Sequence, residues 1–334
     1  MAEKFKTLVV DRFDVSAFAL LKAAPDLEVK STAEPVPTDE DLAGVRGLIA
    51  RSRTKITESF LARAPQLEVL ITGTSGFDHI DLEVTAKRGI KVMFTPGANA
   101  ASAAELTWGL ILSCLRKIPD AGRAIKAGDW RRDALVGREL RGKTLGIVGL
   151  GRIGGRVARV GAAFGMKVIA FDPYIEPEDF AKCEATRVSF EELLRLADVI
   201  SFHVPATPET HHMLTRMHLE SMHNPALLVN SSRGSVVAER DLIEALNMGW
   251  IAGAGLDVFE IEPLPRQSGL MKFPNVVLTP HLGATTQEAF AAASREAAEK
   301  LLAYVRSGTI SDPLPPEAPW AQGVFGRAHS RATP

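Results

Sequence analysis

Apolar and polar positions alternate in short blocks along the first 98 residues of the chain. The apolar blocks have the length of buried strands, and segments with helical spacing lie between them. Thr57 and Asp81 stand where helix N-caps are expected, and Gly89 stands where a helix should end. This alternation predicts a parallel sheet with crossover helices. The expected strands contain TLVV from residue 7, LEVKS from 27, GLIARS from 47, LEVLITG from 67 and KVMFTP from 91.

A second region begins where Pro96 and Gly97 interrupt this pattern. The motif Ser102-Ala-Ala-Glu105 has the spacing of a capping box, and it precedes a long apolar helix that we expect to reach about Ile118. We interpret this helix as the crossing into a second domain. The polar, arginine-rich stretch 128–142 is equally compatible with a solvated loop and with a functional one.

Residues 145–172 combine a buried strand, a glycine turn, an amphipathic helix and a second strand. Gly149, Gly151 and Gly154 have the G-x-G-x-x-G spacing in which the turn is tight and the backbone can approach a pyrophosphate. The N-terminus of the following helix offers unpaired N–H groups to the phosphates. The order of these elements around the glycines predicts a dinucleotide site.

Asp172 ends this unit, 23 residues beyond Gly149. Its carboxylate can accept hydrogen bonds from an adenosine ribose and would repel a 2′-phosphate. The expected cofactor is therefore NAD and not NADP.

Further strands are expected at 198–204, 227–231, 251–256 and 276–279, which gives six in the second sheet. Thr285-x-x-Glu288 has the spacing of a second capping box, before a helix that Gly308 ends. No strand remains for this last helix to cross to, so we expect it to pack on the first domain.

The predicted fold is α/β with two doubly wound parallel-sheet domains. A Rossmann dinucleotide domain, residues 99–285, is inserted into a discontinuous flavodoxin-like substrate domain made of residues 1–98 and 286–310. Residues 311–334 are expected to form an extended, proline-rich tail. Closure of the two domains about the crossings near Asn99 and Thr285 would expel water from a substrate.

Composition narrows the classes of function. The 334 residues suit two domains, and the balance of 39 basic and 40 acidic side chains indicates no nucleic-acid partner. The N-terminus shows no signal-peptide pattern and no apolar run approaches a membrane span, so a cytoplasmic protein without membrane contact is expected. Cys114 and Cys183 form no metal-binding or redox motif, and no metal site is predicted.

Residues with reactive side chains follow the carboxyl ends of the predicted strands, where ligands bind in open parallel sheets. His281 follows the sixth strand and suits general acid and base chemistry near neutral pH. Glu262 could bond the other ring nitrogen and raise the imidazole pKa, although alone it would be a solvated loop residue. Arg233 could grip a substrate carboxylate through two hydrogen bonds. The remaining strand-end residues are Gly151, Asp172, His203, Ser231, Ser232 and Asp257.

Several motifs in combination resemble the D-isomer-specific 2-hydroxyacid dehydrogenases and, within them, the phosphoglycerate dehydrogenases. The resemblance runs from about Ile49 to Gly308. Its motifs are RSRTKIT, GTSGFDHID, SAAELTWGLIL, GRELRGKTLGIVGLGRIG, FHVPATPET, NSSRGSVV, GLDVFEIEP and TPHLGATT.

The resemblance implies a role for each matched position. Arg233 would hold the substrate carboxylate, Glu262 would tune the histidine, and His281 would be the acid/base. Ser75 and Gly76 would face the carboxylate with their backbone. The implied cofactor contacts are Gly149, Gly151, Arg152, Ile153, Gly154, Asp172, His203, Val204, Ser231, Ser232, Asp257 and Gly283.

The resemblance also implies a substrate. Arg51 and Arg53 match positions near the phosphate of 3-phosphoglycerate, whose oxidation to 3-phosphohydroxypyruvate would serve serine biosynthesis; the alternative is a solvated basic strand end. Thr72 departs from the arginine found in many of these enzymes, which puts phosphate selectivity in doubt. The regulatory C-terminal domain of the longer members is not expected.

Two other functions stay open. A glyoxylate or hydroxypyruvate reductase would share all the catalytic residues. A corepressor-like scaffold that senses NAD belongs to a different class. Measuring steady-state turnover and the specific binding of a partner peptide would distinguish such a scaffold from an enzyme. An apolar crossover helix with this resemblance suggests a homodimer built on the dinucleotide domain.

Overall fold

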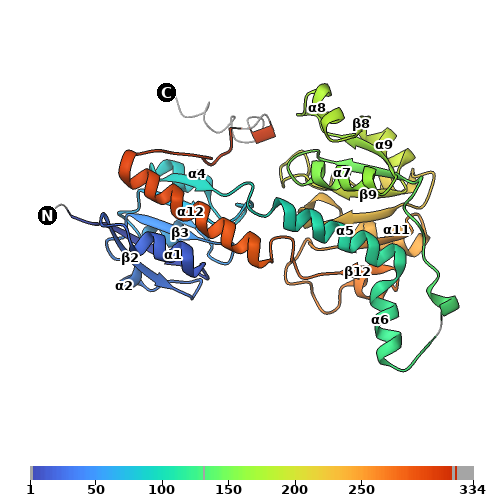
Figure 1. Ribbon diagram of the computed structural model, residues 1–334, viewed down its shortest axis with the longest axis horizontal. Coiled ribbons are helices and arrows are strands. Elements are labelled where there is room, and N and C mark those ends of the chain that lie inside the picture. The colour runs from blue at the N-terminus through green and yellow to red at the C-terminus, as the bar shows by residue number, and fades with distance from the viewer. Residues whose placement is uncertain (1–2, 131, 318–319, 322–334) are drawn as a thin grey trace. The chain divides into compact units, whose positions relative to one another are not determined.

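The computed structural model describes residues 3–130, 132–317 and 320–321 of the chain. It divides into two compact units, which we call the first and the second unit (Figure 1). The first unit comprises Met1–Asn99 and Thr286–Pro334, and the second unit comprises Ala100–Thr285.

Five parallel strands form the sheet in the described part of the first unit, in the order β2-β1-β3-β4-β5. The order reverses between β1 and β3, so a topological switch point lies at the carboxyl ends of these two strands. The strands are β1 (Phe5–Val10), β2 (Leu27–Thr32), β3 (Gly47–Ala50), β4 (Val69–Thr72) and β5 (Lys91–Phe94).

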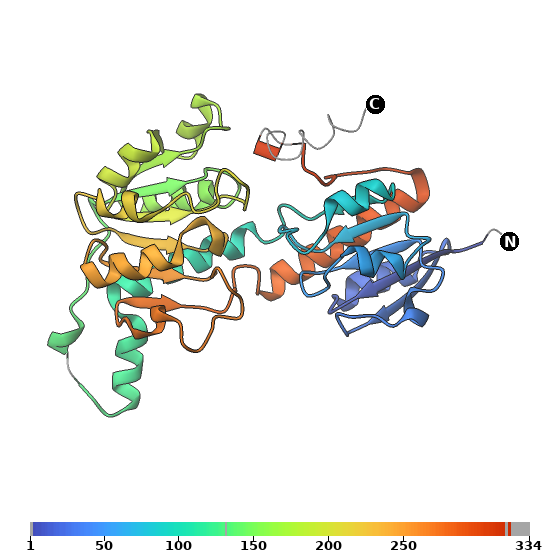
Figure 2. The same ribbon diagram turned by 180° about the vertical axis from the view of Figure 1, so that it is seen from behind.

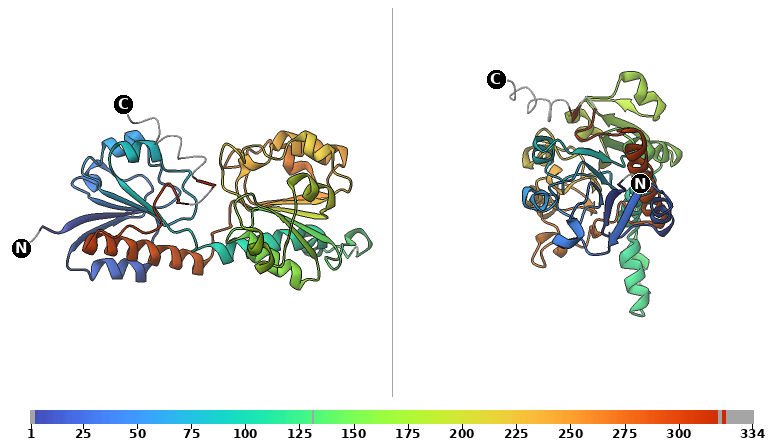
Figure 3. Two further views of the ribbon diagram at one scale, coloured as in Figure 1. Left: turned by 90° about the horizontal axis from the view of Figure 1, so that it is seen from above. Right: turned by 90° about the vertical axis from the view of Figure 1, so that its left-hand side faces the viewer.

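Helices cover both faces of this sheet (Figure 3). One face carries α1 (Val15–Lys22) and α12 (Gln287–Ser307), and the other carries α2 (Asp39–Leu42), α3 (Glu58–Ala62) and α4 (Leu82–Lys87). Ala297 and Leu301 of α12 are fully buried in one core with Val9 and Ile49. The last helix of the chain therefore completes the core of the first unit.

The segment after α12 runs along the free edge of β5. Phe94 N donates to Asp312 O at 3.2 Å, and Leu314 N donates to Val92 O at 2.9 Å. Lys300 of α12 is buried and binds the Asp312 carboxylate at 2.8 Å, which holds the segment in place. Residues 322–334 of the predicted tail lie outside the described part of the chain.

Seven parallel strands form the sheet in the described part of the second unit, in the order β12-β11-β10-β9-β6-β7-β8. The prediction of six strands was wrong because β8 has only two residues, both exposed at the sheet edge, and so shows no apolar pattern. The switch point lies between β6 and β9. The strands are β6 (Thr144–Val148), β7 (Lys167–Phe171), β8 (Thr186–Arg187), β9 (Val199–Phe202), β10 (Leu227–Asn230), β11 (Gly253–Leu256) and β12 (Val276–Leu278).

Two apolar clusters cover the faces of the second sheet. One contains side chains of α5 (Ala100–Arg116), α7 (Gly154–Ala163) and α8 (Pro177–Lys182). The other contains side chains of α9 (Phe190–Leu196), α10 (Arg216–Glu220) and α11 (Glu239–Met248). Short 3-10 turns occur at Arg132–Leu135, Gly234–Val236 and Gly269–Lys272. Within the described residues, no helix combines the length and the apolar character that crossing a membrane requires.

Helix α6 (Ile118–Lys126) was not predicted. It follows a left-handed residue at Lys117, buries none of its side chains and extends away from the rest of its unit (Figure 2). Ile125 is 54% exposed, and Trp130 in the loop after α6 is 77% exposed.

Both predicted capping boxes were wrong. Helix α5 begins at Ala100, so Ser102 lies inside the helix, where its buried hydroxyl has no hydrogen-bond partner among the described residues. The N-cap of α12 is Thr286 and not Thr285, and its side chain accepts from Ala289 N. Sequence spacing alone could not distinguish a cap from similar residues one to three positions away.

Candidate active site

The glycine turn after β6 is shaped by close backbone contacts. Gly149 has a φ of 90°, and a Cβ there would lie 2.7 Å from His203 O and 2.8 Å from a methyl carbon of Val204. A Cβ on Gly154 would lie 2.0 Å from Gly149 O. By contrast, a Cβ on Gly151 would meet no atom within 4 Å. The turn is therefore tight at its base and open at Gly151, where a phosphate must approach.

Donors for a pyrophosphate are available at this turn. The backbone N–H groups of Gly151, Arg152 and Ile153 donate no hydrogen bond to any described residue. They directly precede α7, whose N-terminus carries a partial positive charge. The open space and the unpaired donors fit the pyrophosphate of a dinucleotide.

Asp172, at the end of β7, supports the turn as well as facing a pocket. One carboxylate oxygen accepts from Leu150 N at 2.8 Å, and the other accepts from Tyr174 N at 2.9 Å. Asp172, Arg187 and Ser189 are among the residues that line an adjacent pocket. A half-buried carboxylate beside this pocket can accept a ribose hydroxyl, as predicted for NAD.

His203 lies behind the glycine turn. Its Nε2 is 2.9 Å from the hydroxyl of Ser201, and burial lowers the pKa of His203 to about 3. The imidazole is therefore neutral near neutral pH, and the contacts of His203 and Val204 with Gly149 shape the turn.

A hydrogen-bonded turn after β10 positions Arg233. The buried Asn230 accepts from the backbone N–H of Ser232 at 3.0 Å and from its hydroxyl at 2.8 Å, and it donates to Arg233 O at 2.9 Å. Arg233 Nη1 donates to Ser232 O at 2.7 Å. The Ser231 hydroxyl is 2.7 Å from that of Thr107 on α5. These bonds fix the backbone from which the guanidinium of Arg233 projects.

Asp257 braces the loop that carries His281. Its carboxylate is fully buried and accepts from the Thr279 hydroxyl at 2.6 Å, from Leu282 N at 2.7 Å and from Gly283 N at 2.8 Å. In this arrangement Asp257 and Gly283 hold the turn around the histidine.

His281 and Glu262 form an ion pair, with Nδ1 2.8 Å from Oε2. The hydrogen bond to Glu262 raises the pKa of His281, while burial opposes that rise. Burial is the largest single influence on Glu262 and raises its pKa. The hydrogen bond and charge of His281, the hydrogen bond from Phe259 N and the charge of Arg233 together outweigh burial, so the pKa lies below its usual range. The carboxylate is thus ionised and accepts from Nδ1–H, and Nε2 is the nitrogen that can exchange a proton with a ligand.

Arg51 and Arg53, both predicted to bind substrate, follow β3 in the first unit. Arg53 is paired with Asp11, its Nε lying 3.0 Å from both carboxylate oxygens. Arg51 is stacked 4.9 Å from the ring centre of Phe290, and its buried Nη1 has no hydrogen-bond partner among the described residues. Arg51 therefore has a nitrogen that could bind an anion, whereas Arg53 is already paired with a carboxylate of the protein.

The loop with Ser75 and Gly76 is ordered by Thr72, which stands where many phosphoglycerate dehydrogenases have arginine. The Thr72 hydroxyl is buried, 3.0 Å from His79 Nε2 and 2.6 Å from the hydroxyl of Thr74, which donates to Gly76 O at 2.7 Å. Thr72 is thus an internal contact that shapes the loop.

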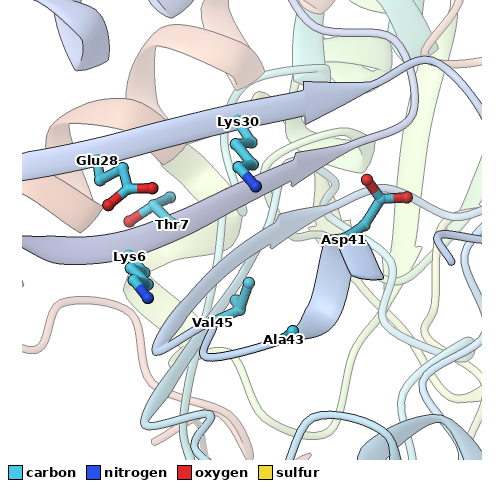
Figure 4. Close-up of a pocket in the computed structure, with 7 residues that line it drawn as sticks. All are labelled: Lys6, Thr7, Glu28, Lys30, Asp41, Ala43 and Val45. Carbon is cyan, nitrogen blue, oxygen red and sulfur yellow. The ribbon is translucent and has the colours of Figure 1, made fainter. Parts of the chain in front are cut away.

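A further small pocket lies in the first unit among β1, β2 and the segment that follows α2 (Figure 4). Lys6, Lys30, Glu28 and Asp41 provide its charged lining. None of the predicted site residues lines this pocket.

Three supporting residues were missed by reasoning from the sequence. Asn230 and Asp11 each stand at the carboxyl end of a strand, so the strand-end rule could have found them. Thr107 lies inside a helix in an apolar stretch and gives no such signal.

Comparison with known proteins places the chain in a family. A family model described as the NAD binding domain of D-isomer specific 2-hydroxyacid dehydrogenases matches residues 108–283. The chain is 40% identical over 303 residues to a hydroxypyruvate reductase of Thermotoga maritima, covering 89% of this chain and 97% of that protein. It is also 40% identical over 303 residues to a D-3-phosphoglycerate dehydrogenase of Methanocaldococcus jannaschii, covering 90% of this chain and 57% of that protein.

The fold is similar to that of solved structures. A D-lactate dehydrogenase from Aquifex aeolicus, complexed with NAD and lactic acid, matches with a TM-score of 0.80 and 32% identity, over 90% of this chain and 95% of that one. The chain belongs to the D-isomer specific 2-hydroxyacid dehydrogenase family, and residues 108–283 match its NAD-binding domain. The predicted family, fold class and cofactor are thereby confirmed. The chain spans 57% of the length of the phosphoglycerate dehydrogenases from M. jannaschii and Bacillus subtilis.

Proposed function

We propose that this protein is an NAD-dependent dehydrogenase of D-2-hydroxy acids. The observation that carries the proposal is the His281–Glu262 pair, in which a carboxylate fixes the imidazole tautomer and raises its pKa. NAD, when bound, supplies the hydride acceptor for C2 of the substrate.

The side chains have separate tasks in this proposal. Arg233 holds the substrate carboxylate through charge-assisted hydrogen bonds. His281 takes the hydroxyl proton at Nε2 during oxidation and returns it during reduction. Glu262 stabilises the imidazolium that forms, and Asp257 keeps the histidine loop in place.

The leading substrate is 3-phosphoglycerate, in an oxidation that would serve serine biosynthesis. Arg51 supports it, since a half-buried guanidinium whose Nη1 has no partner among the described residues gains most from an anionic ligand. Relatives named D-3-phosphoglycerate dehydrogenase support it too.

The second candidate is reduction of hydroxypyruvate or glyoxylate. The pairing of Arg53 with Asp11 and the internal contacts of Thr72 favour it, because they leave fewer donors for a phosphate. The hydroxypyruvate reductase and a glyoxylate reductase from Aeropyrum pernix also match over nearly their whole lengths, 97% and 90%.

Steady-state kinetics separate the two candidates. If 3-phosphoglycerate is the substrate, we expect its kcat/KM to exceed that of D-glycerate by at least about tenfold at low salt. The two values of kcat/KM should become more similar at high salt, because salt screens exposed contacts to the phosphate. Arg51→Ala should remove most of the gap, whereas Arg63→Ala, a matched loss of an arginine paired with Asp39, should not. A better kcat/KM with D-glycerate or glyoxylate in the wild type would contradict the phosphoglycerate assignment and leave the dehydrogenase proposal standing.

We further propose a homodimer built on the second unit. Helix α6 and the loop after it expose Ile118, Ile125, Trp130 and Val136, each more than half exposed. Apolar side chains gathered on an element without buried residues are typical of an association surface.

A further inference from the structure

The residues that follow β1 and β3 lie at the switch point of the first sheet. Val9 pairs with Ile49 in register, so the next side chains along the two strands bring Asp11 beside Arg51. Ligands of open parallel sheets bind at this point. Asp11 was not among the predicted site residues, yet it is the acid at this edge that binds Arg53, one of the two predicted arginines.

Asp11 is a buried carboxylate with a fixed set of partners. Its side chain is only 5% exposed, its backbone is left-handed at a φ of 74°, and Arg12 N donates to it at 2.6 Å. Arg53 donates from Nε to both oxygens at 3.0 Å and from Nη2 to Oδ1. Two of the three nitrogens of Arg53 are thus directed at a carboxylate of the protein and away from any ligand.

Arg51 is the contrasting neighbour. It is packed on Phe290, a Cβ on Gly73 would lie 3.7 Å from its Nη1, and that nitrogen has no hydrogen-bond partner among the described residues. Together the two guanidinium groups and the Asp11 carboxylate carry one net positive charge. One positive charge balances a singly charged ligand group and falls short of balancing a dianionic phosphate.

We propose that Asp11 sets the selectivity of this protein for the charge on the distal group of its substrate, by withholding Arg53 from a phosphate. The inference rests on the proposed function and deepens it. In the wild type a phosphate must compete with Asp11 for Arg53 and is repelled by the carboxylate. Neutral or singly charged distal groups meet no such competition.

The test is the substrate preference of Asp11→Asn. Asparagine tolerates the left-handed backbone, and the substitution removes one charge at nearly constant volume. We expect the ratio of kcat/KM for 3-phosphoglycerate to that for D-glycerate to rise about tenfold, the equivalent of one charge-assisted hydrogen bond. Adding Arg53→Ala should abolish the rise. Asp14→Asn, a matched charge loss three residues away that keeps the N-cap of α1, should leave the ratio unchanged.

An unchanged or lower ratio in folded Asp11→Asn, or a rise that persists after Arg53→Ala, would overturn the proposal. Asp11→Gly, which also suits a positive φ, replaces Asp11→Asn if that variant does not fold. If neither the wild type nor the variants oxidise any D-2-hydroxy acid, the proposed function fails. Calorimetric titration with 3-phosphoglycerate then still tests the role of Asp11. Tighter binding to Asp11→Asn than to the wild type supports that role, and equal or weaker binding refutes it.

Discussion

At the scale of single residues, the proposed chemistry depends on how the protein holds His281. The residue has a left-handed backbone with a φ of 55°, an uncommon conformation outside glycine, and Asp257 fixes the turn on its C-terminal side. Backbone geometry thus orients the imidazole and Glu262 raises its pKa, two effects that substitutions can separate.

Removing the imidazole should abolish most of the chemistry and leave cofactor binding intact. We expect His281→Ala to lower kcat by about 10² to 10⁴, with a Kd for NADH close to that of the wild type in a fluorescence titration. His223→Ala, which removes an exposed histidine, is the matched control. Near-normal turnover of His281→Ala across the pH range would mean that another group is the base.

Glu262→Gln should move the pH profile in a defined direction. The hydrogen bond to Glu262 raises the pKa of His281, so its loss lowers that pKa. Oxidation requires the neutral imidazole, and the acidic limb of kcat/KM should therefore shift to lower pH. Glu260→Gln removes a carboxylate from the same loop, where it pairs with His212, and should leave the limb in place. A limb that stays or moves upward in Glu262→Gln would argue against this coupling.

We expect Asp172 to govern the choice of cofactor in the same local manner. We expect the wild type to have a higher kcat/KM with NAD than with NADP, because the carboxylate repels a 2′-phosphate. Asp172→Asn should narrow the preference mainly by weakening NAD, and Glu178→Gln on the exposed side of α8 should not. Equal use of both cofactors by the wild type would refute the argument.

At the scale of elements, the glycine turn has no room for a side chain at one glycine and ample room at another. A Cβ at Gly154 would lie 2.0 Å from a carbonyl oxygen, whereas a Cβ at Gly151 would meet open space. Gly154→Ala should therefore lower the free energy of unfolding, by about 1 to 3 kcal/mol or more. Gly151→Ala should keep the Tm of the cofactor-free protein and weaken NADH binding by about tenfold. Thermal unfolding and NADH titration check both, and a destabilised Gly151→Ala would contradict the assignment.

The regular elements were readable from the sequence because they are long, apolar and bounded by strong signals. The 145–172 unit and the strand ends at Arg233 and Asp257 followed from such patterns. The pairing of His281 with Glu262 was anticipated from chemistry, although no pattern could place residues 19 apart at 2.8 Å.

Other features depend on tertiary context and were not readable. The two-residue β8 is defined by its pairing with the edge of β7 and not by its own sequence pattern. The caps lie three residues before the predicted one in α5 and one residue after it in α12, which reflects packing of the helix and not its local sequence. The engagement of Arg53 by Asp11 joins residues 42 apart through neighbouring strands, and the sequence showed only two basic side chains.

At the scale of the whole molecule, the exposed residues of α6 and its loop lead to a prediction on assembly. We expect sedimentation velocity to show a dimer, and Trp130→Asp to shift it toward monomer, because a charge in an apolar interface must be desolvated. Met217→Asp places the same charge on another side chain that is 72% exposed, and it should leave the dimer intact. A monomeric wild type would refute the proposed dimer.

The membership of α12 in the first unit also sets an order of events during synthesis. Ala297, Ala298 and Leu301 complete a core with Phe5 and Leu21, which leave the ribosome almost three hundred residues earlier. The second unit has all its strands and helices once Thr285 has emerged, so it can fold while the first sheet still lacks α12, one of the two helices that cover one of its faces. During that interval the nascent chain exposes the apolar side chains that α12 later covers, and we expect chaperones to protect this surface.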